Sequence, residues 1–68
     1  MTDAIDGYLS RLAQQVEPRA LVVETPAGWL LRMPGAPDVR LGTEAASGFG
    51  AAKQALQAWM RARRQNQL

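Results

Sequence analysis

The sequence predicts an α+β fold: a two-layer sandwich in the order α-β-β-β-α, with both helices on one face of a three-stranded antiparallel meander. Apolar residues recur at helical spacing near both ends of the chain, and β-branched residues concentrate in its middle. Proline and glycine then divide this middle part into short segments. The 68 residues are expected to form a single small domain over residues 1–68.

A first helix is expected over about residues 3–16. Its apolar side chains have the spacing of one buried helix face: Ile5, Tyr8, Leu9, Leu12, Ala13 and Val16. Either Thr2 or Asp3 can cap its start. Pro18 ends the helix, because the residue before a proline is pushed out of helical geometry.

Three strands are expected over about residues 20–25, 29–33 and 38–42. Pro26 with Gly28 favours a type I turn between the first two, and Pro34 with Gly35 a type II turn before the third. Because side chains alternate along a strand, one face is expected to meet the helices and to carry Leu21, Val23, Trp29, Leu31, Met33, Val39 and Leu41. The other face is expected to carry Val22, Glu24, Leu30, Arg32 and Arg40.

A second helix is expected over about residues 47–65, with Ser47 favoured over Thr43 as its N-cap. One side of this helix is apolar and is expected to pack on the sheet: Phe49, Ala52, Leu56, Trp59 and Met60. Another side is an alanine strip formed by Ala51, Ala55, Ala58 and Ala62. Either the first helix or a second chain packs against this strip, and the first helix is favoured because it has leucines to bury.

The composition argues against catalysis. The chain has no cysteine and no histidine, and its six acidic residues show no pairing that indicates a general base or a metal site. Residues 47–53 are glycine-rich but lack the glycine spacing of a Walker loop or of a dinucleotide-binding fingerprint. We therefore expect no enzyme activity, no cofactor and no metal. A cytoplasmic location is expected from the absence of cysteine, of a signal peptide and of a membrane span.

The exposed face of the expected sheet gives the leading hypothesis of function. Val22 and Leu30 are expected at the centre of an interface, with Glu24, Arg32 and Arg40 at its rim. Such a face predicts either a homo-oligomer or a protein partner. A plain solvated sheet remains the alternative, since a few exposed apolar residues are normal on a protein surface.

The arginines give a second hypothesis, the binding of nucleic-acid phosphates. The candidate contacts are Arg32, Arg40, Arg61, Arg63 and Arg64. The last three lie at the end of the second helix, where cations are also favoured by the helix dipole alone. The net charge of the chain is +2, so its overall charge does not decide between these two explanations.

The predicted order of elements resembles that of double-stranded RNA-binding domains. Ser47, Ala51 and Ala55 match the framework of the second helix of that family. The positions of the family's helix lysines are taken here by Gly48, Phe49 and Ala52. The resemblance implies RNA binding, while these departures remove the side chains that hold RNA in the family.

The chain also resembles plant AP2-type domains and integrase arm-binding domains, which combine a three-stranded sheet with one helix. The resemblance rests on residues 41–43, Leu-Gly-Thr, and on the alanine-rich helix. Those domains read DNA with the exposed face of the sheet. The resemblance therefore implies that Arg32 and Arg40 contact DNA.

Overall fold

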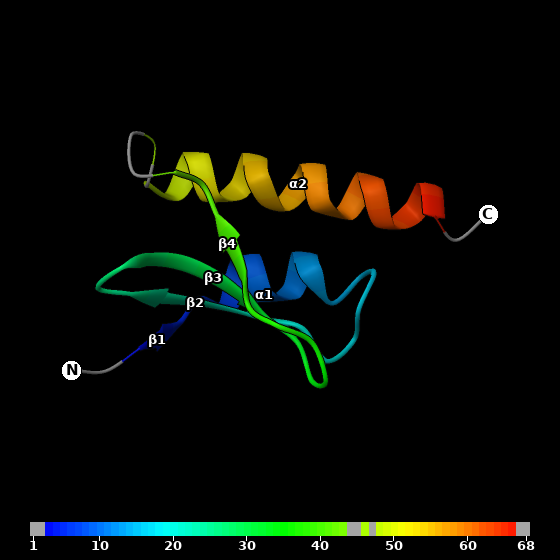
Figure 1. Cartoon of the computed structure of the whole chain (residues 1–68), viewed down its shortest axis with the longest axis horizontal. Helices are drawn as coiled ribbons and strands as arrows, with labels where there is room; N and C mark the ends of the chain where they lie inside the picture. Colours follow the sequence, from blue (N-terminus) through cyan, green and yellow to red (C-terminus); the bar gives the residue numbers. More distant parts are fainter. Residues whose placement is uncertain (1–2, 44–45, 47, 67–68) are drawn as a thin grey trace.

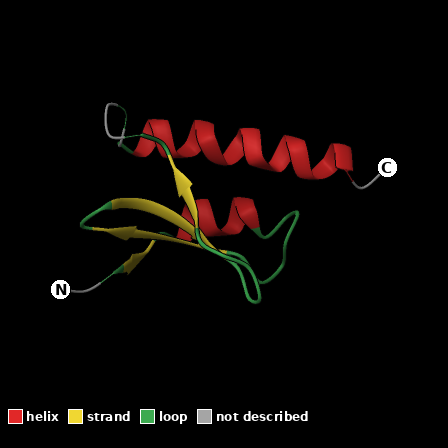
Figure 2. Cartoon of the chain, viewed as in Figure 1, coloured by secondary structure: helices red, strands yellow, loops and turns green. Residues whose placement is uncertain are grey.

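The computed structural model describes residues 3–43, 46 and 48–66. The elements in chain order are β1 (Ala4–Ile5), α1 (Gly7–Ala13), β2 (Leu21–Thr25), β3 (Gly28–Arg32), β4 (Val39–Leu41) and α2 (Phe49–Asn66). The strands form one antiparallel sheet in the order β1-β2-β3-β4, and both helices pack against the same face of it (Figures 1 and 2). The predicted α+β fold is confirmed, with four strands in place of the expected three-stranded meander.

The additional strand, β1, occupies residues that were expected to begin the first helix. Ala4 and Ile5 pair with Glu24 and Val23 of β2. Helix α1 begins only after Asp6, whose carboxylate accepts a hydrogen bond from the Leu9 amide at 2.8 Å and so caps the helix. The expected start at about residue 3 is therefore wrong, Asp3 is not the cap, and Thr2 lies outside the described residues.

Helix α1 completes the edge of β2 beyond the end of β1. The Asp6 amide donates to the Val22 carbonyl at 2.8 Å, and the Ser10 hydroxyl accepts from the Val22 amide at 2.8 Å. Further along the same edge, the Gln14 side-chain amide donates to the Ala20 carbonyl at 3.1 Å. Asp6, Ser10 and Gln14 are spaced four residues apart, so a polar line along α1 takes the place of a strand partner.

The register of the β2–β3 hairpin differs from the expected one by one residue in β2. The hairpin closes with Thr25 opposite Gly28, and this register continues to Val22 opposite Leu31. Residues directly opposite each other share a face, so Val22 joins Leu31 on the face that meets the helices. Leu21 and Val23 therefore lie on the other face, and the expectation that they meet the helices is wrong.

The core lies between the sheet and the two helices. It contains Leu9, Ala13, Ala20, Val22, Trp29, Leu31, Met33, Leu41, Ala52, Leu56 and Met60. Leu56 and Met60 of α2 are buried there, as the helical spacing predicts, whereas Phe49 is 44% exposed because it stands in the first turn of α2. The expected cap residue Ser47 lies outside the described residues.

The alanine strip of α2 does not receive α1. Helix α1 instead approaches α2 through Tyr8, whose ring lies 6.0 Å from that of Phe49 and beneath the ammonium group of Lys53. This contact lies on roughly the opposite side of α2 from the strip, given 3.6 residues per turn. Ala58 and Ala62 are exposed, so the expected packing of the first helix on the strip is wrong.

The connection from β4 to α2 requires a glycine at residue 42. Gly42 has a φ of 94°, and a Cβ atom placed on it would lie 2.6 Å from the Ala46 carbonyl oxygen. The predicted turn at Pro34 and Gly35 is also present: Gly35 has a φ of 73°, and the Ala36 amide bonds to the Met33 carbonyl at 3.4 Å.

Neither helix in the described part of the chain is long and apolar enough to cross a bilayer.

Candidate functional site

The face of the sheet opposite the helices is the main candidate for a functional surface. We call it the open face, and it carries Ile5, Leu21, Val23, Thr25, Leu30, Arg32 and Arg40. The core cluster draws its sheet residues from the other face, and Val23 is not part of that cluster. No helix covers the open face in the described part of the chain (Figure 1).

A row of side chains crosses the open face from one edge of the sheet to the other. The pairings Ile5 with Val23, Val23 with Leu30 and Leu30 with Arg40 place one residue of each strand in this row. The Ile5 side chain is 62% exposed, while Val23, between Ile5 and Leu30, is only 3% exposed. The row is therefore apolar over three strands and ends in a guanidinium on the fourth.

Leu21 extends this apolar surface by one position along β2. It lies opposite Arg32, next to the Val23–Leu30 pair, and 36% of it is exposed. Ile5 and Leu21 are two of the four large apolar side chains that are exposed in the described part of the chain. Because both residues lie on the open face, their exposed apolar area is concentrated there and not scattered over the protein surface.

Arg32 lies on the open face, but its charge is balanced by two carboxylates. Its guanidinium donates to Asp38 with a shortest distance of 3.2 Å, and it lies 3.8 Å from the Asp3 carboxylate. The hydrogen bond with Asp38, and then the charge of that carboxylate, raise the pKa of Arg32 above its ordinary value. Because all three groups are exposed to water, the ion pair between Arg32 and Asp38 contributes little stability, and a phosphate would have to compete with both carboxylates for the guanidinium.

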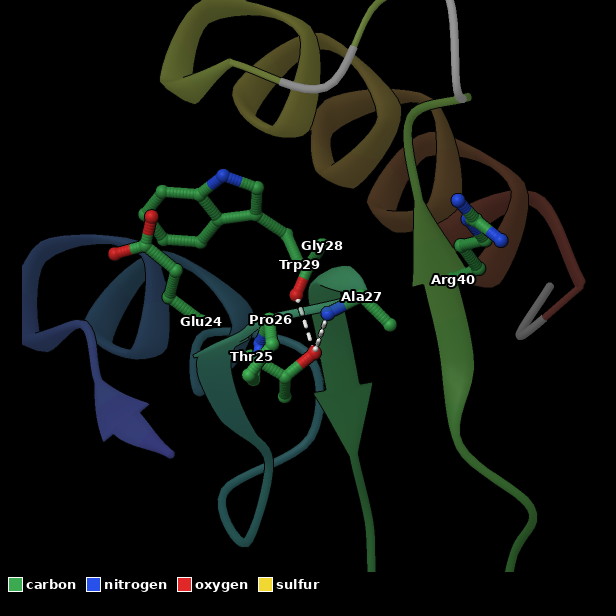
Figure 3. A pocket seen from close by; sticks show the side chains of 7 residues that line it. All are labelled: Glu24, Thr25, Pro26, Ala27, Gly28, Trp29 and Arg40. Atoms are coloured by element: carbon green, nitrogen blue, oxygen red, sulfur yellow. Dashed lines mark hydrogen bonds between the residues drawn. The ribbon is translucent and has the colours of Figure 1, made fainter. Parts of the chain in front are cut away.

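Arg40 lies at the β4 end of the row and forms no ion pair within the described residues. It also borders a hollow of about 470 Å³ around the tip of the β2–β3 hairpin, where Thr25 accepts a hydrogen bond from the Ala27 amide. Figure 3 shows the Glu24 carboxylate and the Trp29 ring on one side of the hairpin and the Arg40 guanidinium on the other. The charged groups of this hollow therefore do not converge on one ligand.

The arginines at the end of α2 lie in the helical layer, away from those of the open face. Arg63 is engaged, since it bonds to Glu17 at 3.2 Å and its guanidinium lies 5.3 Å from the centre of the Trp59 ring. Arg61 and Arg64 border a groove between α1 and α2. The arginines expected to contact nucleic acid are thus divided between the two layers of the sandwich and form no continuous basic surface.

Three aromatic side chains meet where α1, β3 and α2 come together. The Phe49 ring lies 6.0 Å from the ring of Tyr8 and 6.0 Å from that of Trp29, the latter in an edge-on arrangement. Tyr8 is 51% exposed, so this cluster forms part of the surface as well as part of the packing.

Within the described residues, no group of three acidic, cysteine or histidine side chains is placed to hold a metal ion.

Sequence reasoning located part of the open face. Leu30, Arg32 and Arg40 lie on it as expected. Val22 is fully buried against the helices and Glu24 lies opposite Trp29 on the helix-facing side of the sheet, so the expectations for these two residues are wrong. The side chains that were missed are Ile5, Leu21 and Val23. For the last two the signal was present, because a turn with Pro26 and Ala27 at its centre places Thr25 opposite Gly28 and fixes the register.

The fold and the open face define a small two-layer α+β domain, and helices cover only one face of its sheet within residues 3–43, 46 and 48–66. Comparison of the chain with protein-family models, with curated proteins and with solved structures gave no match.

Proposed function

We propose that this chain is a non-catalytic interaction domain that self-associates through the open face of its sheet. The observation that carries the proposal is the apolar row of Ile5, Val23 and Leu30, with Leu21 beside it, on a face that neither described helix covers. Two such faces can pack against each other as two sheets, with side chains from both interdigitating. In a twofold dimer the same surface of both copies meets, so an apolar surface can pack against its own copy.

The electrostatics of the open face favour a second copy of the chain as its occupant. Asp38 and Asp3 balance the charge of Arg32, so two faces can approach without opposing like charges at that position. Arg40 lies at the outer strand, where it can remain at the wet rim of an interface. The surface is thus apolar at its centre and nearly neutral around it, as a self-complementary interface requires.

The size of the chain also supports self-association. A domain of 68 residues buries only about 60% of the surface of its unfolded chain, so small domains often gain stability from oligomers. Burying a fully exposed leucine or isoleucine contributes about 1.5–3 kcal/mol, and covering Ile5, which is 62% exposed, or Leu21, which is 36% exposed, contributes a corresponding part of this. We also propose a cytoplasmic location for this activity. Cytoplasmic proteins rarely contain disulfides, and this chain has no cysteine with which to form one.

Nucleic-acid binding is less well supported than a protein interface. A typical nucleic-acid binder neutralises six or more phosphates with basic side chains that line one surface. Here Arg32 is engaged by carboxylates, and Arg61 and Arg64 lie in the other layer. Arg40 is then the one arginine of the open face without an ion pair among the described residues.

Sedimentation velocity at several protein concentrations tests the proposal. The unmodified chain should form a dimer whose fraction rises with concentration, and Ile5→Glu or Leu21→Glu should shift it to monomer. Gln54→Glu is the matched control, because it adds the same group at an exposed position of α2 and should leave the dimer unchanged. A chain that stays monomeric throughout, or Ile5→Glu and Leu21→Glu variants that dimerise like the unmodified chain, would overturn the proposal.

A further inference from the structure

We propose that the groove between α1 and α2 binds an acidic amphipathic helix of a partner protein. The groove has a volume of about 410 Å³ and is bordered by Leu12, Gln15, Gln57, Met60, Arg61 and Arg64. It lies in the helical layer, so it is separate from the open face of the sheet. The C-terminal half of α2 carries three of these residues, Met60, Arg61 and Arg64, and continues beyond the end of α1 (Figure 1).

The floor of the groove is apolar and belongs to both helices. Leu12 of α1 is partly buried against the core, and Met60 of α2 is 6% exposed. A methionine adapts its shape to the side chain packed on it, because it is unbranched and flexible. The floor therefore suits an apolar side chain such as leucine on the docking segment.

The rim of the groove is basic. Arg61 and Arg64 are exposed and form no ion pair within the described residues. Glu17, the acidic residue that follows α1, is bound by Arg63 at 3.2 Å, and Arg63 also lies over the Trp59 ring. The two rim arginines are therefore available to carboxylates of a partner, and none of the described residues that line the groove is acidic.

The spacing of the rim residues matches a helix. Gln57, Arg61 and Arg64 are separated by four and then three residues on α2, so they form a line about 10 Å long at 1.5 Å per residue. A helix lying along this line presents carboxylates one turn apart to Arg61 and Arg64, and an apolar side chain between them to the floor. The amide of Gln15 on the opposite wall can bond to polar side chains of the same segment.

A peptide fits the groove better than a nucleic acid does. Two arginines are few for a phosphate backbone, and an apolar floor formed by Leu12 and Met60 contributes nothing to phosphate binding. Packing of a third helix on α1 and α2 also follows the ordinary geometry of helix pairs. The chemistry of floor and rim together thus selects an acidic segment with one apolar side.

Fluorescence anisotropy with a labelled synthetic peptide tests this inference. The probe is an amphipathic helix of about 18 residues, long enough to form five turns, with a leucine stripe and glutamates one turn apart. The unmodified chain should bind it, and binding should weaken as salt is raised. Replacing the glutamates by glutamine, or Arg61 and Arg64 of the protein by glutamine, should weaken binding about five- to tenfold.

The matched control is Arg19→Glu, at an exposed arginine outside both surfaces, which alters the net charge by the same amount. This control should bind the peptide like the unmodified chain. Equal loss in the Arg19→Glu control, or no loss in the Arg61 and Arg64 variant, would overturn the inference. So would a short DNA duplex that binds more tightly than the peptide and depends on the same two arginines.

Discussion

The Ser10 side chain bonds to both polar groups of the Val22 backbone. Its hydroxyl oxygen accepts a hydrogen bond from the Val22 amide at 2.8 Å, and its O–H group donates one to the Val22 carbonyl at 3.4 Å. Both residues are buried, Ser10 with 3% and Val22 with none of its surface exposed. A helix side chain thus performs the function of a neighbouring strand and joins α1 to the edge of β2.

Replacing Ser10 by alanine should therefore destabilise the fold by about 1–3 kcal/mol, because the Val22 amide would be left buried without an acceptor. Urea unfolding followed by circular dichroism measures this loss. Arg11→Ala, at the exposed neighbouring position, should change the free energy of unfolding by less than about 0.5 kcal/mol. Equal stability of the two variants would contradict this function of Ser10.

The cap of α1 gives a second prediction. Asp6→Ala should destabilise the chain by about 1 kcal/mol, because the Leu9 amide loses its acceptor at the start of the helix. Asp6→Asn is the control, since asparagine caps nearly as well and should retain most of the stability. If the asparagine variant lost as much as the alanine variant in thermal unfolding, capping would not explain the position of this residue.

Two glycines should respond in opposite directions to the same substitution. Gly42→Ala should destabilise the fold by more than about 1 kcal/mol, because its φ is positive and the new Cβ would meet the Ala46 carbonyl at 2.6 Å. Gly50→Ala, in the first turn of α2 with no atom within 4 Å of the new Cβ, should be neutral or stabilising by up to about 1 kcal/mol. Differential scanning calorimetry of both variants checks the sign, and a stabilised Gly42→Ala would refute the close approach.

The orientation of α2 is tested by Leu56. Leu56→Ala should cost about 2–5 kcal/mol, since this side chain is fully buried between the helix and the sheet. Arg64→Ala, on an exposed position of the same helix, should change the stability little. A near-zero effect of Leu56→Ala in chemical denaturation would mean that α2 presents another side to the sheet.

Much of the fold could be predicted because its signals are local. The turns at Pro26 and Pro34, the two strands that follow them and the buried side of α2 depend on residues close together in the chain. The two-residue hairpin turn also determines the register of β2. The predicted face of Val22 was wrong because the faces of β2 and β3 were predicted without using that turn. Leu30, Arg32 and Arg40 of the open face followed from β3 and β4 alone.

Other features could not be predicted from the sequence because they depend on partners far away in it. Ile5 fits the helical spacing of α1 equally well, and it is the pairing with Val23 that makes it a strand residue and exposes it. Likewise Arg61, Arg63 and Arg64 lie close together in the sequence, yet of these three arginines Glu17 engages only Arg63.

The sequence by itself determined the α+β class, the sites of the turns and the residues of α2 that enter the core, since proline, glycine and apolar spacing act within a few residues. Tertiary structure decided where α1 begins, that Ile5 joins the open face and which arginines are engaged. The physical reason is that the buried edge of β2 must have hydrogen-bond partners, and the fold supplies them from β1, Asp6, Ser10 and Gln14.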